Sequence, residues 1–297
     1  RRHLSMIDPD SVIPFDRLPE KFAESLENPP FEPVAPRPAA TIVLMRDGDN
    51  GVEILLMKRS RSAGFVPGAY VFPGGRVDGS DGTDEMLQRI DGLTQARAAD
   101  RLDLNDVTPP AIAYYLAALR EAFEETGILV AHDTEGGEPA TAAEDESVNA
   151  LRDDLMEDRI SFADTLDRMG CRIDGEAIEY LAHWITPKPE PRRYDTRFFA
   201  AKVREGALPI VDPREMTDAV WITPQAALLR NNEGTLPMVF PTIKTLEQLR
   251  DHASTDDALG DLARQSVRTI MPTLVITPTG IGMDMDGESQ AEDDIGS

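Results

Sequence analysis

Apolar and charged positions recur with helical spacing between residues 112 and 128. Five large apolar residues share one side of such a helix: Ile112, Tyr115, Leu116, Leu119 and Phe123. The carboxylates of Glu121, Glu124 and Glu125 share the opposite side, because residues three and four apart lie within about 100° of each other on a helix. The pattern therefore predicts a helix that buries one side and presents three acids on the other.

The ends of this helix and the remaining elements follow from capping residues and apolar runs. We expect Thr108 to be the N-cap, Pro109 to lie in the first turn and Gly127 to end the helix. Apolar, β-branched runs predict strands at residues 39–45, 52–58, 69–72, 180–186, 197–203 and 219–222, a strand that opens at 129, and a strand-like run at 268–276. Residues 47–51, Asp-Gly-Asp-Asn-Gly, predict a hairpin turn between the first two strands. Helical spacing predicts helices at 84–102 (broken at Gly92), 146–158, 161–170, 224–230, 241–250 and 254–264.

The two ends of the chain have a different composition from its centre. Residues 1–40 contain eight prolines, which predicts an extended arm with one short helix near residues 19–26. Residues 280–297 contain six acids and no base, which predicts a disordered tail. We therefore expect a proline-rich arm over residues 1–36, one domain over 37–250, and a C-terminal extension with an acidic tail over 251–297.

Composition and charge limit the function classes. A chain of 297 residues with 41% hydrophobic content can bury a full core. The net charge of −24 argues against nucleic acid and anionic membranes as partners, since both attract basic surfaces. An anionic small molecule stays open as a substrate, because a few arginines and a divalent cation can reverse the potential inside one cleft.

Cysteine, histidine and hydropathy narrow the setting further. The single cysteine, Cys171, excludes an internal disulfide and suits a reducing compartment; we expect it to be a buried apolar residue. The four histidines lack the spacing of zinc ligands. The chain has no apolar run of 18 residues and its first residues lack the apolar core of a signal peptide, so we expect a cytoplasmic protein without a spanning helix.

The acidic side of the predicted helix is the strongest candidate for chemistry. Carboxylates at this spacing repel one another and destabilise an isolated helix. A hard divalent cation held by oxygens would offset the repulsion. The alternative is an acidic face that is simply solvated.

Residues 120–128, Arg-Glu-Ala-Phe-Glu-Glu-Thr-Gly-Ile, resemble the second half of the Nudix box, and residues 72–78, Phe-Pro-Gly-Gly-Arg-Val-Asp, resemble the turn with which that box opens. The resemblance to the Nudix hydrolase family covers about residues 37–250. It implies an α/β fold, the Nudix α/β/α sandwich with a mixed sheet. Here 45 residues separate Gly75 from Arg120, about 31 more than in the family's box, so we expect a helical insertion at about 80–110, with accessory helices at about 146–170.

This insertion is similar to one in the branch of coenzyme A diphosphatases, as are residues 58–60, 68–75, 184–187 and 193–199. We expect the insertion to give structural support, while a lid, a substrate wall or a dimer contact stays open. The box's first glutamate would fall at Asp81. Because the insertion begins there, we expect Asp81 to be an ordinary loop acid.

The resemblance implies hydrolysis of a nucleoside diphosphate linked to another group. It implies that Glu121, Glu124 and Glu125, with the carbonyl of Gly75, hold Mg²⁺ or Mn²⁺, which activates a water. We expect Glu121 to be the base, because its neighbour Arg120 can pair with and orient a carboxylate; Glu124 completes the predicted catalytic set. Two distal acids stay open as the base: Glu215 and Asp195.

Several residues are candidates for contact with the substrate's phosphates, because guanidinium groups match phosphate oxygens and glycine allows close backbone approach. They are Arg59, Arg61, Gly74, Arg193 and Arg197. For the last two arginines, structural pairing with nearby acids is an equal alternative. Trp184, Trp221, Tyr114 and Tyr115 are expected to pack in the core.

The predicted substrate is coenzyme A or an acyl derivative, cleaved to 3′,5′-ADP and phosphopantetheine. ADP-ribose, NADH or another nucleotide sugar is an alternative within the same class. A catalytically silent module that binds a nucleotide is an alternative of another class, disfavoured by the complete acid set. The acidic balance disfavours mRNA decapping. A homodimer stays open.

Overall fold

The computed structural model of the chain describes residues 12–15, 32–60, 68–212 and 215–284. The chain divides into two compact units. The larger unit comprises Ala39–Ala182 and Arg197–Val267, and the smaller comprises Arg1–Pro38, His183–Thr196 and Arg268–Ser297. In the described residues, no helix has the length and apolar character needed to cross a membrane.

A mixed sheet has most of its strands in the larger unit, and its edge strand at Thr269–Ile270 belongs to the smaller unit. Its order is β11-β3-β2-β10-β9-β12, with β4 and β5 pairing at the sides of β3 and β2. These strands are β2 (Arg37–Gly48), β3 (Gly51–Arg59), β4 (Tyr70–Val71), β5 (Gly74–Arg76), β9 (Ile178–Ile185), β10 (Tyr194–Lys202), β11 (Met216–Ile222) and β12 (Thr269–Ile270). The hairpin between β2 and β3 pairs Gly48 with Gly51, which confirms the turn predicted there. β12 pairs with β9 in parallel, whereas β3 pairs antiparallel with β2 and β11.

Helix α4 (Ala111–Thr126) packs along this sheet and is buried on nearly every side. The apolar side predicted from the sequence is at most 2% exposed at each of its five positions. Gly127 ends the helix with a φ of +68°, as predicted. The N-terminal prediction is wrong: the N-cap is Pro110, because Thr108 and Pro109 still belong to the preceding loop.

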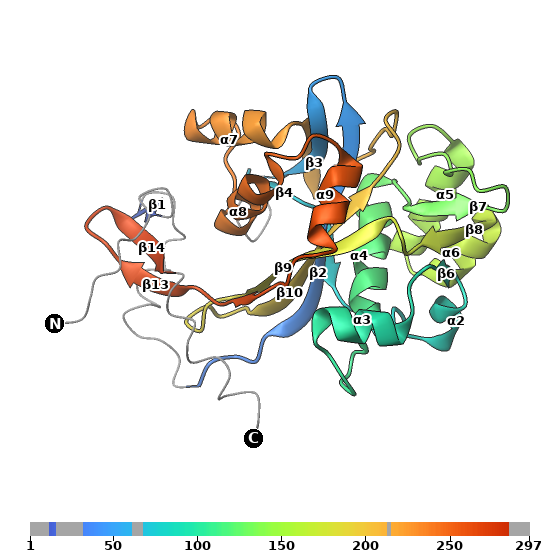
Figure 1. Cartoon of the computed structure of the whole chain (residues 1–297), viewed down its shortest axis with the longest axis horizontal. Coiled ribbons are helices and arrows are strands. Elements are labelled where there is room, and N and C mark those ends of the chain that lie inside the picture. Colours follow the sequence, from blue (N-terminus) through green and yellow to red (C-terminus); the bar gives the residue numbers. More distant parts are fainter. Residues whose placement is uncertain (1–11, 16–31, 61–67, 213–214, 285–297) are drawn as a thin grey trace. The chain divides into compact units, whose positions relative to one another are not determined.

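The insertion and the accessory helices form one lobe beside α4 (Figure 1). The predicted long helix is two short ones, α2 (Asp84–Leu87) and α3 (Gln95–Leu102), separated by strand β6 (Ile90–Asp91) and by Gly92, whose φ is +75°. β6 joins a second sheet of order β6-β8-β7. Its other members and the lobe's helices are β7 (Ala131–Asp133), α5 (Glu146–Met156), α6 (Phe162–Met169) and β8 (Cys171–Asp174). Cys171 is buried, as predicted.

The insertion leaves and rejoins the domain at one place. A Cβ added to Gly82 would lie 2.7 Å from Cγ of Pro110, so the start of the insertion touches the residue that caps α4. Gln95 also accepts a hydrogen bond from the amide of Ile112 in the first turn of α4. The two ends of the insertion therefore lie close together. The opening turn of the box and helix α4 stay in contact in spite of the extra residues.

Three helices complete the larger unit: α7 (Pro224–Asn232), α8 (Phe240–Leu249) and α9 (Thr255–Leu262). α9 is held at both ends. The carboxylate of Asp47 accepts hydrogen bonds from the amide and hydroxyl of Thr255, each 2.8 Å long. Arg101 of the insertion donates to the carbonyls of Leu262 and Gln265 at the other end. The larger unit thus runs to Val267, beyond the boundary at residue 250 expected from the sequence.

The smaller unit contains a sheet of order β1-β14-β13. Its strands are β1 (Ile13–Pro14), β13 (Thr273–Ile276) and β14 (Gly280–Asp284). The prediction of a disordered tail from residue 280 is therefore wrong for β14, which pairs with β13 over four positions. Composition misled there because strand pairing satisfies the backbone of a segment whose acids lie mostly further along. Residues 285–297 and the helix expected at 19–26 lie outside the described residues.

Candidate active site

The glycines of the opening turn lie on β5, which pairs antiparallel with β2: Gly75 is opposite Ala40 and Gly74 is opposite Thr41. A Cβ added to Gly74 would lie 2.6 Å from the carbonyl oxygen of Ala40, so no larger residue fits. The amide of Gly74 donates a 3.1 Å hydrogen bond to Oε2 of Glu125. Strand β5 and helix α4 are therefore joined directly at the acids.

Gly75 lies against a second acid of the helix. A Cβ at this position would lie 2.3 Å from Oε1 and 2.6 Å from Oε2 of Glu121, so the carboxylate occupies the space that a side chain would need. Gly74, Gly75, Glu121 and Glu125 thus form one compact group, as the sequence predicted for the box.

Arg120 connects the acids to one another. All five N–H groups of its guanidinium have an acceptor within 3.1 Å. Nε and Nη2 donate to the two carboxylate oxygens of Asp81, and Nη2 also donates to the carbonyl of Arg76. Nη1 donates to Glu121 and to Glu124. One half of the group is thereby anchored on the opening turn while the other half orients two acids of α4.

The expectation that Asp81 is an ordinary loop acid is wrong. Asp81 is 2% exposed, forms a two-pronged ion pair with Arg120, and accepts a hydrogen bond from the amide of Asp78. The sequence did carry the signal, since Asp81 stands six residues after Gly75, at the spacing of the box's first acid. The insertion begins only after it, so it displaces nothing.

The three acids of α4 resist ionisation. Burial raises the pKa of Glu121 to about 7 and that of Glu125 to about 8, and the charge of Glu121 adds to the shift at Glu125. Burial also raises the pKa of Glu124, against the opposing effect of Arg120. Ionisation of these acids is therefore costly, and once ionised they carry more negative charge than Arg120 neutralises.

These residues fit a divalent cation in donor type and in charge. Carboxylate and carbonyl oxygens are the ligands that Mg²⁺ and Mn²⁺ prefer. A cation beside them would lower the raised pKa values of the acids. Within the described ranges, no three acidic, histidine or cysteine side chains are already gathered in the geometry of a metal site. Nη1 of Arg120 bridges Glu121 and Glu124, so a cation between these two acids requires that they turn from it.

Two further predicted residues lie next to the acids. Arg59 ends β3, and its charge lowers the pKa of Glu125 while that of Glu215 raises it. The carbonyl of Glu215 accepts a 2.8 Å hydrogen bond from the amide of Ser60, which follows Arg59. Nε of Arg59 is buried without a hydrogen-bond partner in the described residues. Arg61 lies outside the described residues.

The predicted arginines Arg193 and Arg197 form hydrogen bonds with groups outside the acid cluster. Arg197 is 5% exposed and donates to the carbonyl of Leu102 and the hydroxyl of Tyr180. Arg193, in the smaller unit, donates to the carbonyls of Thr186 and Val34. Both guanidinium groups thus serve internal packing.

Asp195 also belongs to the smaller unit, where it pairs with Nε2 of His183; Nδ1 of that ring lies 2.8 Å from the hydroxyl of Thr269. Tyr114, Tyr115 and Trp184 are buried as predicted, and Trp221 is half-buried.

Comparison with known proteins finds a family and several similar proteins. The model of the family described as the NUDT19 Nudix domain matches residues 35–249. The chain is similar to proteins named acyl-coenzyme A diphosphatase NUDT19: it is 28% identical to that of Homo sapiens over 78% of this chain and 70% of the relative. It is 29% identical to that of Gallus gallus over 69% and 63%, respectively.

For the relative from Xenopus laevis the identity is 28%, over 59% of this chain and 54% of the relative. The chain therefore spans little more than half the length of some of these proteins. Among solved structures, a Nudix hydrolase from Alicyclobacillus acidocaldarius matches with a TM-score of 0.61 and 29% identity, over 76% of this chain and 96% of that one. This match supports the α/β fold with its mixed sheet.

Proposed function

The chain belongs to the Nudix family described by the NUDT19 Nudix domain, and from this premise we propose that it is a divalent-metal-dependent diphosphatase. The observation that carries the proposal is the group formed by Gly74, Gly75, Glu121 and Glu125, with Arg120 orienting Glu121 and Glu124. This arrangement gathers carboxylate oxygens beside the two half-buried glycines of the opening turn. It is suited to a cation that binds the oxygens of a diphosphate.

The residues of the chain have separate tasks in this proposal. Glu121, Glu124, Glu125 and the carbonyl of Gly75 would hold Mg²⁺ or Mn²⁺, which when bound neutralises phosphate charge and acidifies a water. Glu121 is the first candidate for the base that accepts the proton of the attacking water, because Arg120 donates to its carboxylate at 3.1 Å and can orient it. Glu215 is the second candidate for this base, since it lies near Glu125.

Contacts with the substrate are assigned to Arg59, Arg61 and Gly74. The charge of Arg59 lowers the pKa of Glu125, so its guanidinium acts on the acids of the site and suits the phosphate that a cation there would hold. Arg193 and Arg197 are left out because carbonyl and hydroxyl groups of the protein already occupy them. Asp195 is left out as the base because it pairs with His183.

The proposed substrate is coenzyme A or an acyl derivative, cleaved at its diphosphate to 3′,5′-ADP and the (acyl-)phosphopantetheine. The support for it is the name of the relatives, acyl-coenzyme A diphosphatase, together with the matched box and its insertion. A location in the cytoplasm and a homodimer stay predictions.

The test is a product analysis by anion-exchange chromatography with Mg²⁺ and three substrates: coenzyme A, ADP-ribose and NADH. We expect 3′,5′-ADP from coenzyme A. Turnover of ADP-ribose with coenzyme A inert would contradict the substrate but not the diphosphatase. Nucleotide binding without turnover, whichever of Mg²⁺ and Mn²⁺ is supplied, would contradict the enzyme and favour a silent binding module.

A further inference from the structure

The segment of residues 204–212 connects β10 and β11. In space it contacts the C-terminal end of α4. A helix leaves its last carbonyl groups without partners inside the helix. The carbonyl of Thr126, the last residue of α4, accepts a 2.8 Å hydrogen bond from the amide of Ile210. Thr126 directly follows Glu125, so this bond fixes the backbone beside an acid of the site.

Two segments contact Gly127, the residue that ends α4. A Cβ added to Gly127 would lie 2.7 Å from Cγ2 of Ile210 and 2.5 Å from Cβ of Ala142. The carbonyl of Gly127 accepts a 2.9 Å hydrogen bond from the amide of Ala142. The last turn of α4, which carries Glu124 and Glu125, is therefore held from outside the helix on two sides.

The 204–212 segment is itself held by Trp221 of β11. Nε1 of the indole donates a 3.1 Å hydrogen bond to the carbonyl of Ala207, a residue that is 1% exposed. The guanidinium of Arg46 lies 4.4 Å from the centre of the indole ring and is paired with Glu53 at 2.8 Å. Arg46 reaches the same carbonyl only at 3.4 Å. The indole N–H is thus the closer of two donors to this carbonyl, and Trp221 stabilises this path of the segment by about the free energy of one hydrogen bond.

We propose that Trp221 is a positioning residue, which holds the 204–212 segment against the end of α4 and thereby places Glu125 for the divalent cation. The inference rests on the proposed function, because it concerns the same site. Trp221 touches neither the acids nor the opening turn in any described contact, and acts through Ala207, Ile210 and Thr126. The indole N–H matters for this role, while the ring serves packing.

The test measures Mn²⁺ binding to the full chain by titration calorimetry, without substrate. Trp221→Phe keeps an aromatic ring for Arg46 to cover, but removes the indole N–H together with part of the fused ring, so thermal melting is measured beside it. We expect its Mn²⁺ affinity to fall about three- to ten-fold, the effect of one hydrogen bond. In turnover, the Mg²⁺ concentration for half-maximal rate should rise while the KM for the nucleotide stays unchanged. A loss of packing alone would lower thermal stability without changing the metal affinity.

A double-mutant comparison then tests the path. If Trp221 acts through Glu125, Trp221→Phe should weaken Mn²⁺ binding no further in a Glu125→Gln background. Additive losses, or an unchanged affinity of Trp221→Phe, would overturn the inference. If Trp221→Phe does not fold, Trp221→Met also fills the space without an N–H donor, and an unchanged affinity in that variant would likewise overturn the inference. Wild-type protein that binds no Mn²⁺ would instead contradict the proposed function.

Discussion

At the scale of residues, the candidate site depends on Arg120, whose guanidinium N–H groups are all hydrogen-bonded. Arg120 donates all its N–H groups, and Asp81 takes two of these bonds from a position that is 2% exposed. A shorter acid than the family's glutamate is sufficient because the bonds to Arg76 and Asp78 bring the turn close. Asp81 is thus the anchor from which the orientation of Glu121 and Glu124 is built.

Asp81→Asn should destabilise the protein by about 3 kcal/mol, because removing one partner of a buried ion pair leaves the other charge poorly compensated. Asp78 is the matched control: its carboxylate is 60% exposed and 3.7 Å from Arg120, so Asp78→Asn should change stability by less than about 0.5 kcal/mol. Urea unfolding followed by circular dichroism measures both. Equal effects would show that Asp81 is no anchor.

Gly75→Ala should lower turnover about 10²-fold, because the added methyl group would take the place of the Glu121 carboxylate and move it by about 1 Å. Gly79→Ala is the control, since a Cβ at Gly79 meets no atom within 4 Å. Initial rates with coenzyme A measure the effect, with thermal melting to confirm the fold. Full activity of Gly75→Ala would mean that Glu121 is not required where it lies.

At the scale of elements, α4 carries more acid than its surroundings neutralise. Glu121 and Glu125 have pKa values near 7 and 8 in the folded protein, against 4.5 for an ordinary glutamate. A folded-state pKa above the unfolded one gives stability that is present below the unfolded pKa and is lost as pH rises through the folded one. These two acids therefore lower the stability of the folded protein as the pH rises toward about 8.

Without added metal, the melting temperature should fall between about pH 5.5 and pH 8 as these acids ionise. The acids with lowered pKa values, such as Asp91 and Asp133, are already ionised throughout this range and add no slope. Glu125→Gln should flatten the dependence, and Mg²⁺ should stabilise the wild type more at pH 8 than at pH 5.5. A melting temperature that rises across this range would contradict the charge excess.

Helix α9 gives a second test at this scale. Leu262 is fully buried, so Leu262→Ala should cost about 2–5 kcal/mol through lost contacts and a cavity. Leu229→Ala removes the same atoms from α7 at a side chain that is 59% exposed, and should change stability by less than about 0.5 kcal/mol. Urea unfolding compares the two. A small effect of Leu262→Ala would contradict the packing of α9 in the larger unit and would indicate that residues 251–267 are a loosely attached extension.

The elements that sequence patterns predicted well are those with local causes. The apolar side of α4, its end at Gly127 and the hairpin at residues 47–51 follow from spacing and from glycine. What the patterns missed depends on contacts distant in sequence. Asp47 lies more than 200 residues before Thr255, and Asp81 is 39 residues before Arg120. The pairing of β14 with β13 is likewise not encoded by composition.

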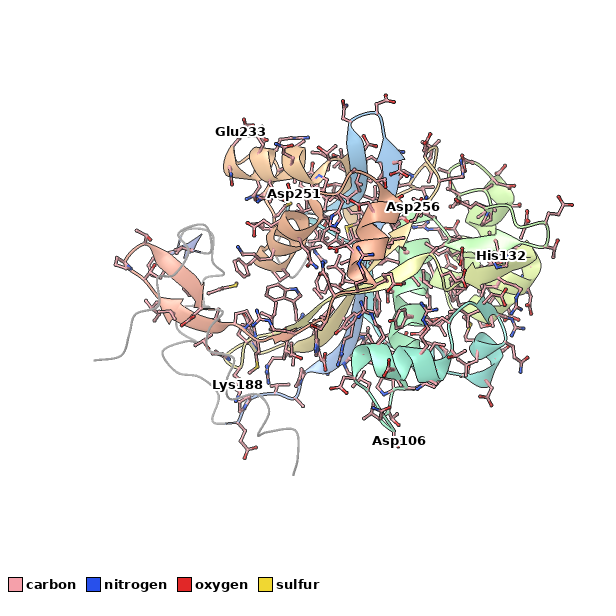
Figure 2. All side chains as sticks on the ribbon, viewed as in Figure 1. Asp106, His132, Lys188, Glu233, Asp251 and Asp256 are labelled. Atoms are coloured by element: carbon pink, nitrogen blue, oxygen red, sulfur yellow. The ribbon has the colours of Figure 1, made fainter. Side chains whose placement is uncertain are left out.

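At the scale of the whole molecule, the net charge of −24 comes from acids throughout the sequence. Figure 2 shows labelled acids on separate elements of the larger unit: Asp106 before α4, Glu233 at the end of α7, Asp251 after α8 and Asp256 on α9. All four residues are exposed. Each of these four acids is solvated by itself. The acids of α4 lie together and are partly buried, so their charge is stabilised by a bound cation.

This contrast defines the most direct measurement of the central claim: the Mg²⁺ dependence of coenzyme A cleavage in the wild type, in Glu124→Gln and in Glu233→Gln. We predict saturable Mg²⁺ dependence in the wild type, loss of about 10²–10³-fold in rate for Glu124→Gln, and wild-type rates for Glu233→Gln. Cleavage that persists in a chelator, or a Glu124→Gln variant as active as the wild type, would contradict the account.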